Sequence, residues 1–181
     1  MTPEELITQM ESRMAVADWT GARELFVPHP TVVAANWKAS WDAGWVCYKL
    51  GQLDEAFQHL SRAATLAPHE ASALGAYGLV ARDLGRDDEA ERALTDSLAI
   101  REAYPWRLAL SGFYRRKGQF HKAEDVLRRG VELRPDHRER IESLAHLLHD
   151  LGRRDEAETL YERAAALPTR EERRATSSSK S

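Results

Sequence analysis

The side chains best suited to bind a ligand form an aromatic row early in the chain. Trp37, Trp41, Trp45 and Tyr48 are spaced at i, i+4, i+8 and i+11, which places them on one side of a helix. Aromatic rings offer a large, rigid contact area with one polar group, so the row is suited to hold a protein segment. The alternative is that the rings fill space between neighbouring helices, which we expect for Trp37.

Basic side chains are the second candidate group. Lys49, Arg82, Arg115 and Arg116 stand in three segments of the chain, with Arg107 close by. A guanidinium group binds a carboxylate at two points, so these residues favour a ligand with acidic groups. The alternative is that each is a solvated surface charge without a specific role.

Other reactive residues do not form a convincing site. His146 and His149 with Asp150 fall short of the three or four ligands of a zinc site, so we expect a solvated helix surface and no cofactor. The single cysteine, Cys47, follows apolar residues and is expected to be buried rather than nucleophilic. The sequence contains no phosphate-binding glycine loop, H-E-x-x-H motif or nucleophile elbow, and we therefore expect no enzyme.

Composition narrows the classes of partner. The chain has 181 residues, of which 43% are hydrophobic and 30% charged, as in a folded globular protein. A net charge of −3 disfavours nucleic acid as the main partner. The first residues lack the basic block of a secretory signal and no apolar run reaches membrane-spanning length, so we expect a cytoplasmic protein without a membrane partner.

A repeat organises the elements that carry these residues. Gly51, Gly85, Gly118 and Gly152 are spaced 34, 33 and 34 residues apart, and Ala17 stands where a first glycine would fall. Apolar residues at three- and four-residue spacing on both sides of each glycine predict two helices joined by a turn in which glycine adopts the left-handed conformation. The units are 3–36, 37–70, 71–103, 104–137 and 138–171.

Small residues recur at fixed positions of the unit. The twentieth residue is alanine in all five units, and the twenty-seventh is small in the last four. The eighth residues are Met10, Gly44, Gly78, Ser111 and Ala145. Because two helices approach closely only where neither carries a bulky side chain, this pattern predicts tight helix hairpins whose stacking builds the core.

The pattern resembles the tetratricopeptide repeat (TPR) family over residues 3–171. The resemblance implies an all-α fold, a right-handed superhelical array of antiparallel helix hairpins (a TPR-like α-solenoid) with about five repeats in residues 1–171. The first unit is degenerate, since Pro28 and Pro30 must shorten its second helix. Residues 172–181 lack apolar side chains apart from Ala175, and we expect a disordered tail.

The resemblance also implies a function. Proteins of this kind are non-enzymatic adaptors or chaperone-like scaffolds that bind a peptide or partner helix in a concave groove. The groove positions of the family correspond here to Trp41, Trp45, Tyr48, Lys49, Leu79, Arg82, Arg115 and Arg116. The Lys/Asn clamp of chaperone-tail-binding members is absent, because the chain has a single asparagine, Asn36.

Two alternatives stay open from the sequence. The chain can be an assembly or regulatory subunit that acts through its exposed end or its convex face, with self-association through the last hairpin, where Leu160, Tyr161 and Leu167 form an apolar edge. RNA binding or catalysis in the groove is less favoured, by charge and by the missing motifs.

Overall fold

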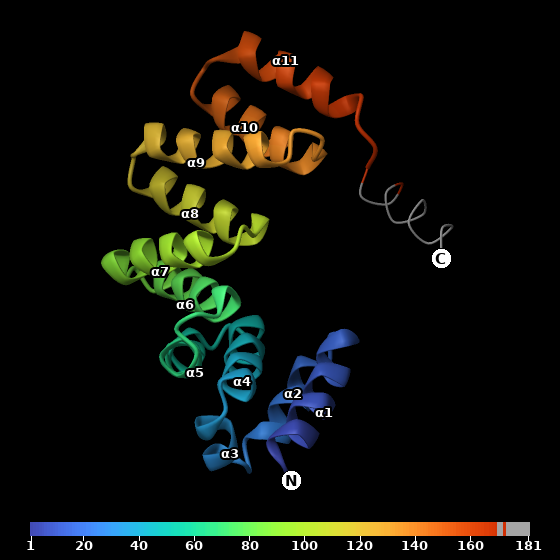
Figure 1. Ribbon diagram of the computed structural model, residues 1–181, viewed down its shortest axis with the longest axis vertical. Coiled ribbons are helices and arrows are strands. Elements are labelled where there is room, and N and C mark those ends of the chain that lie inside the picture. The colour runs from blue at the N-terminus through green and yellow to red at the C-terminus, as the bar shows by residue number, and fades with distance from the viewer. Residues whose placement is uncertain (170–171, 173–181) are drawn as a thin grey trace. The chain divides into compact units, whose positions relative to one another are not determined.

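The protein is described here by a computed structural model covering residues 1–169 and 172, and this part of the chain is helical without strands (Figure 1). The helices are α1 (Pro3–Ala15), α2 (Trp19–Phe26), α3 (Pro30–Ala35), α4 (Trp37–Lys49), α5 (Leu53–Leu66), α6 (Ala71–Asp83), α7 (Asp87–Ile100), α8 (Tyr104–Arg116), α9 (Phe120–Leu133), α10 (Arg138–Asp150) and α11 (Arg154–Ala165). None of these described helices is long and apolar enough to cross a membrane.

The chain divides into two compact units, Met1–Leu110 and Ser111–Ser181, and the boundary falls inside α8. In the first unit α1 packs against α2, α4 against α5, and α6 against α7; in the second, α10 packs against α11. Each pair is a helix hairpin joined by a short turn (Figure 1). The predicted class, an all-α array of TPR-like hairpins, is confirmed.

Four turns use glycine as the repeat predicts. Gly51, Gly85, Gly118 and Gly152 have φ angles of 77°, 73°, 69° and 78°, in the left-handed region that costs glycine nothing. Ala17, at the equivalent place in the first hairpin, has a φ of 58° and is the non-glycine residue with positive φ in the described chain. The first turn therefore keeps the geometry without the residue that favours it.

The first hairpin departs from the others after Phe26. The segment with Pro28 and Pro30 ends α2 early, and the chain resumes as the short helix α3, whose Val33 is buried. The hydroxyl of Ser40 on α4 donates to the carbonyl oxygen of Val33 at 2.7 Å. The predicted shortening is thus present, and a further short helix packs against α4.

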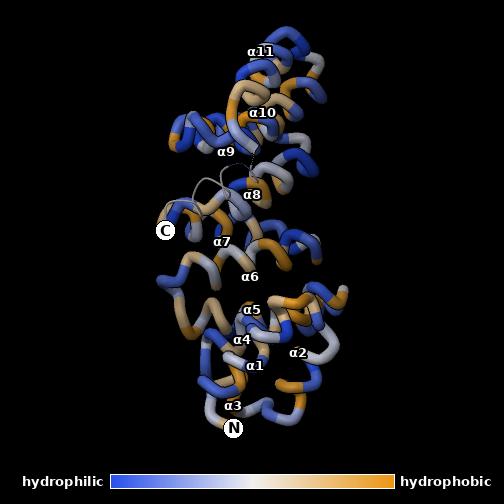
Figure 2. Tube along the Cα trace, turned by 90° about the vertical axis from the view of Figure 1, so that its right-hand side faces the viewer, coloured by the Kyte–Doolittle hydropathy of each residue, from blue (hydrophilic) through white to orange (hydrophobic). Residues whose placement is uncertain are grey.

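Small residues allow the hairpin helices to touch. A Cβ atom added to Gly44 would lie 2.6 Å from Leu60 Cγ, and one added to Gly78 would lie 2.9 Å from the backbone nitrogen of Leu94. Hydrophobic and hydrophilic residues alternate along the helices in Figure 2, as expected where each helix buries one side. Cys47 is fully buried as predicted, and burial raises the pKa of its thiol to about 11.

The predicted tail, 172–181, lies outside the described residues except for Glu172.

Candidate functional site

The aromatic row predicted from the sequence is formed on α4. The rings of Trp41 and Trp45 are stacked with centroids 5.9 Å apart and planes 4° apart, and Trp45 stacks on Tyr48 at 5.4 Å and 24°. All three side chains are half-buried. The row packs on the core with one side and leaves part of each ring exposed.

Two hydrogen bonds to α6 hold the ends of the row. The indole N–H of Trp41 donates to the carbonyl oxygen of Ser72 at 3.0 Å, and the hydroxyl of Tyr48 donates to Asp83 Oδ2 at 2.8 Å. Burial, and then the bond to Asp83, raise the pKa of Tyr48, which keeps the phenol protonated. The rings are therefore fixed before any ligand arrives, which lowers the entropic cost of binding.

An ion pair with a buried carboxylate lies at the N-terminal end of the row. Lys38 Nζ lies 2.6 and 2.7 Å from the two carboxylate oxygens of Asp42, 2.7 Å from Glu11 Oε1 on α1, and 5.0 Å from the ring centroid of Trp41. The side chain of Asp42 is fully buried, and this burial raises its pKa to about 6 although Lys38 opposes the shift. Asp42 therefore does not face solvent, and it fixes Lys38 beside the ring of Trp41.

Lys49 lies at the opposite end of the row. Its ammonium nitrogen is 5.1 Å from the ring centroid of Trp45 and 5.9 Å from that of Trp19, at the start of α2. The residue is exposed. A cation between two indole faces is attracted by both rings, so its position is defined while its charge stays accessible.

The remaining residues of the predicted set divide between the two units. Leu79 and Arg82 lie half-buried on α6 in the first unit, where Arg82 pairs with Asp83 at 2.8 Å. Arg115 and Arg116 are exposed on α8 in the second unit. Arg115 pairs there with Asp150 on α10 at 2.6 Å. The structure thus brings together five of the eight predicted residues in the first unit, linked by ring contacts on α4 and, for Arg82 on α6, through the Asp83 that Tyr48 also contacts: Trp41, Trp45, Tyr48, Lys49 and Arg82.

Sequence reasoning missed two residues around this face. Trp106, near the start of α8, packs over Gly75 of α6, where a side chain would collide with its ring. Trp19 accompanies Lys49 from the first hairpin. Neither residue stands at a family groove position. The sequence offered one indication of Trp106: Gly75 has no side chain, which leaves room for a ring above it.

The histidine pair on α10 has no metal-site geometry. In the described part of the chain no group of three or more His, Cys, Asp or Glu side chains could hold a metal ion. The ring of His146 instead lies 5.4 Å from the ring of Tyr161 on α11, at an interplanar angle of 62°. His146 and Tyr161 therefore contribute to packing between the two helices of the last hairpin.

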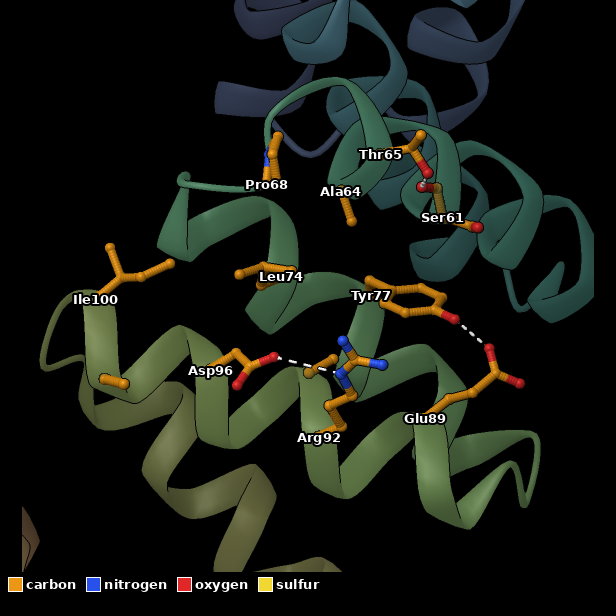
Figure 3. A pocket seen from close by; sticks show the side chains of 12 residues that line it. Ser61, Ala64, Thr65, Pro68, Leu74, Tyr77, Glu89, Arg92, Asp96 and Ile100 are labelled. Atoms are coloured by element: carbon orange, nitrogen blue, oxygen red, sulfur yellow. Dashed lines mark hydrogen bonds and ion pairs between the residues drawn. The ribbon is translucent and has the colours of Figure 1, made fainter.

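A hollow of about 540 Å³ lies elsewhere in the first unit, between α5, α6 and α7. Leu74 and Tyr77 line it from α6, while Arg92 and Asp96 on α7 form an ion pair at its edge (Figure 3). The hydroxyl of Tyr77 is hydrogen-bonded to Glu89. None of the residues lining this hollow belongs to the set predicted from the sequence.

A known family of helical repeat domains matches this sequence, in agreement with the observed helix hairpins. The sequence profile of the cilia and flagella-associated protein 70 C-terminal domain, a TPR domain, matches residues 9–179. A search of curated protein sequences gives no match.

Solved structures match over most of the chain. A crystal structure of MamA superposes with a TM-score of 0.73 at 20% identity, covering 92% of this chain and 96% of that one. MamA 41-end from Desulfovibrio magneticus RS-1 gives 0.75 at 14% identity, covering 91% and 94%. TTC0263, a thermophilic TPR protein in Thermus thermophilus, gives 0.70 at 20% identity, covering 90% of each chain. At these identities the likeness establishes the fold.

Proposed function

Because the chain belongs to the family of the cilia and flagella-associated protein 70 C-terminal domain, we propose that it is a non-enzymatic scaffold that binds a segment of a partner protein. TPR arrays serve in general as protein-interaction scaffolds, since stacked hairpins offer an extended surface. The binding face in this proposal is the exposed side of α4 and α6.

The aromatic row carries the proposal. Three stacked rings, Trp41, Trp45 and Tyr48, are half-buried, and hydrogen bonds to α6 hold the outer two, Trp41 and Tyr48. Fixed aromatic side chains of this kind supply most of the binding energy in many protein interfaces. These two hydrogen bonds satisfy the polar groups of half-buried rings and hold Trp41 and Tyr48 in defined positions against α6, while part of each ring stays exposed.

The arginines support the proposal less than the rings do. Arg82 and Arg115 each already pair with a carboxylate of their own unit, Asp83 and Asp150. A ligand would have to displace these carboxylates in order to gain the same contact. The contribution of acidic ligand groups is therefore argued separately below.

A display library of short random peptides, selected on the full chain, tests this function. Peptides enriched on the wild type should lose at least tenfold in affinity for Trp41→Ala/Trp45→Ala, because hot-spot truncations cost about 2 kcal/mol or more. Trp41→Phe/Trp45→Phe keeps an aromatic ring at both positions and should lose less. Far-UV circular dichroism of each variant verifies that the helices are intact. If the enriched peptides bind both double variants as well as the wild type, this face is not the binding site.

The hollow between α5, α6 and α7 favours a second candidate, in which the partner binds in this hollow rather than along the aromatic row. Its lining includes the apolar residues Leu74 and Ile100, and Ile100 is 45% exposed. Thr65→Arg/Ile100→Glu changes two exposed positions at its edge and should abolish binding only if the partner docks there. Loss with this pair, together with unchanged binding by the tryptophan variants, would favour the second candidate.

A further inference from the structure

Lys49 differs from the other cations of the aromatic face in having no carboxylate partner among the described residues. Lys38 is held by Asp42 and Glu11, and Arg82 by Asp83. Within the residues that the structure describes, the interactions of Lys49 are its two contacts with the rings of Trp45 and Trp19. The position of this charge is thus set by aromatic rings, which leave its hydrogen-bond donors available to a ligand.

The ring beside Lys49 offers a second donor. The indole N–H of Trp41 is satisfied by Ser72, whereas that of Trp45 donates no hydrogen bond to any described residue. Trp45 is half-buried, and its ring centroid lies 5.1 Å from Lys49 Nζ. Because the ammonium group of Lys49 lies against the Trp45 ring, one bound anion can contact both side chains.

The surroundings do not compete for this pair of donors. Asp18, next to Trp19 in the chain, is already bonded to Arg13 at 2.8 Å and to the backbone N–H of Gly21 at 2.9 Å. Those two bonds lower the pKa of Asp18, so its charge is compensated locally. A carboxylate bound by Lys49 accepts a charge-assisted hydrogen bond, which is stronger than one between neutral groups.

We propose that Lys49 and the indole N–H of Trp45, flanked by Trp19, bind a carboxylate of the partner segment. This inference rests on the proposed function, since the carboxylate belongs to a peptide lying along the aromatic row. It moves the recognition of acidic groups from the arginines to Lys49. The bound group is an Asp or Glu side chain, or a C-terminal carboxylate, of a protein segment.

The experiment repeats the peptide-library selection on four forms of the full chain. Peptides enriched on the wild type should carry Asp, Glu or a free C-terminus at one fixed position, and this preference should vanish with Lys49→Gln. The acidic peptides should bind Lys49→Gln about tenfold more weakly, as expected for one hydrogen bond to a charged group. Lys49→Arg should retain the preference. Lys122→Gln is the matched control, because Lys122 lies 5.0 Å from the ring of Tyr114 in the second unit.

Nitrogen-15 NMR of the tryptophan side chains provides an independent readout. Adding an enriched acidic peptide should shift the indole signal of Trp45 downfield, while its amide counterpart, with Gln for Glu, should not. An acidic preference that survives Lys49→Gln, or no acidic preference at all, overturns the carboxylate site. If peptides still require Trp41 and Trp45 in that case, the proposed function stands; if no peptide requires them, it fails as well.

Discussion

Ala17 is the residue at which the sequence and the required backbone conformation disagree most clearly. Four of the turns place glycine in the left-handed region, and the first turn places alanine there with a φ of 58°. For a residue with a Cβ atom, this conformation is about 1–2 kcal/mol less stable than the right-handed one. The strain is local, because the hydrogen bonds of the turn, such as Asp18 N–H to Arg13 O at 2.9 Å, match those of the glycine turns.

Ala17→Gly should therefore stabilise the chain. The relief of strain exceeds the greater flexibility of glycine in the unfolded state, for a net gain of about 0.5–1 kcal/mol in the free energy of unfolding. Gly85→Ala is the reverse change and should cost about 0.5–1 kcal/mol, since no atom lies within 4 Å of the added Cβ and only the backbone strain, less the lower flexibility of alanine in the unfolded state, acts. Urea titrations of both variants test this; a lower midpoint for Ala17→Gly would contradict it.

Asp42 should give stability an unusual dependence on pH. Its pKa is raised by burial from 3.8 in the unfolded chain to about 6 in the folded one. The folded state thus binds the proton more tightly, and the stabilisation present below pH 4 is lost as the pH rises through 6. The loss amounts to about 2–3 kcal/mol. Carboxylates whose pKa is lowered by folding, such as Asp18, have the opposite effect: their contribution to stability is lost as the pH falls through their folded-state pKa.

Comparison with Asp42→Asn isolates this effect. The free energy of unfolding of the wild type, minus that of the variant, should fall between pH 4 and 6.5, and chemical unfolding at several pH values measures it. A constant difference over this range would show that folding leaves the pKa of Asp42 unchanged, and a rising one that folding lowers it; either result would contradict the prediction.

At the scale of the helices, glycine determines how closely α6 and α7 approach. A Cβ at Gly78 would meet the backbone nitrogen of Leu94 at 2.9 Å, and backbone cannot turn aside as a side chain can. Gly78→Ala should cost about 1–2 kcal/mol, because the overlap exceeds the gain in helix propensity. Thermal unfolding measures the change. An unchanged midpoint would show that the two helices separate without cost.

The helices and their pairing were largely predictable from the sequence. The glycine spacing, the alanines and the prolines are local signals, and each specifies a turn, a close contact or a helix end. The short helix α3 was not predicted, because Pro28 and Pro30 indicate where α2 ends and not that the chain resumes as a helix. Its formation depends on burying Val33 and on the bond to Ser40, which are contacts with α4.

The site was predictable in part. The aromatic row follows from helical spacing, so Trp41, Trp45 and Tyr48 were found. The ion pairs of Arg82 and Arg115 were not, because several acidic residues lie within reach of a flexible arginine and tertiary packing selects one. Trp19 and Trp106 reach the face from the first hairpin and from α8, through contacts between residues distant in the sequence. Spacing along one helix carries no information on such contacts.

At the scale of the whole molecule, the five tryptophans all precede residue 111 and so belong to the first unit. Tryptophan fluorescence therefore reports on the first unit, whereas circular dichroism reports on all helices. In repeat proteins each hairpin depends mainly on its neighbours, so the two units need not unfold together.

Leu148→Ala, in the second unit, should separate the two signals. The side chain is fully buried, and its truncation should cost about 2–4 kcal/mol. The unfolding midpoint should fall by circular dichroism and fall less by fluorescence. Equal shifts in both signals would indicate that the chain unfolds as one cooperative unit.

The burial of Cys47 has a practical consequence for labelling. Maleimide dyes react with the thiolate, which is scarce at neutral pH when the pKa is about 11 and the sulfur is fully covered. A cysteine introduced at an exposed position, such as Arg92, will carry the dye while the native thiol stays unmodified. Fluorophores for distance measurements can thus be attached without replacing a core residue.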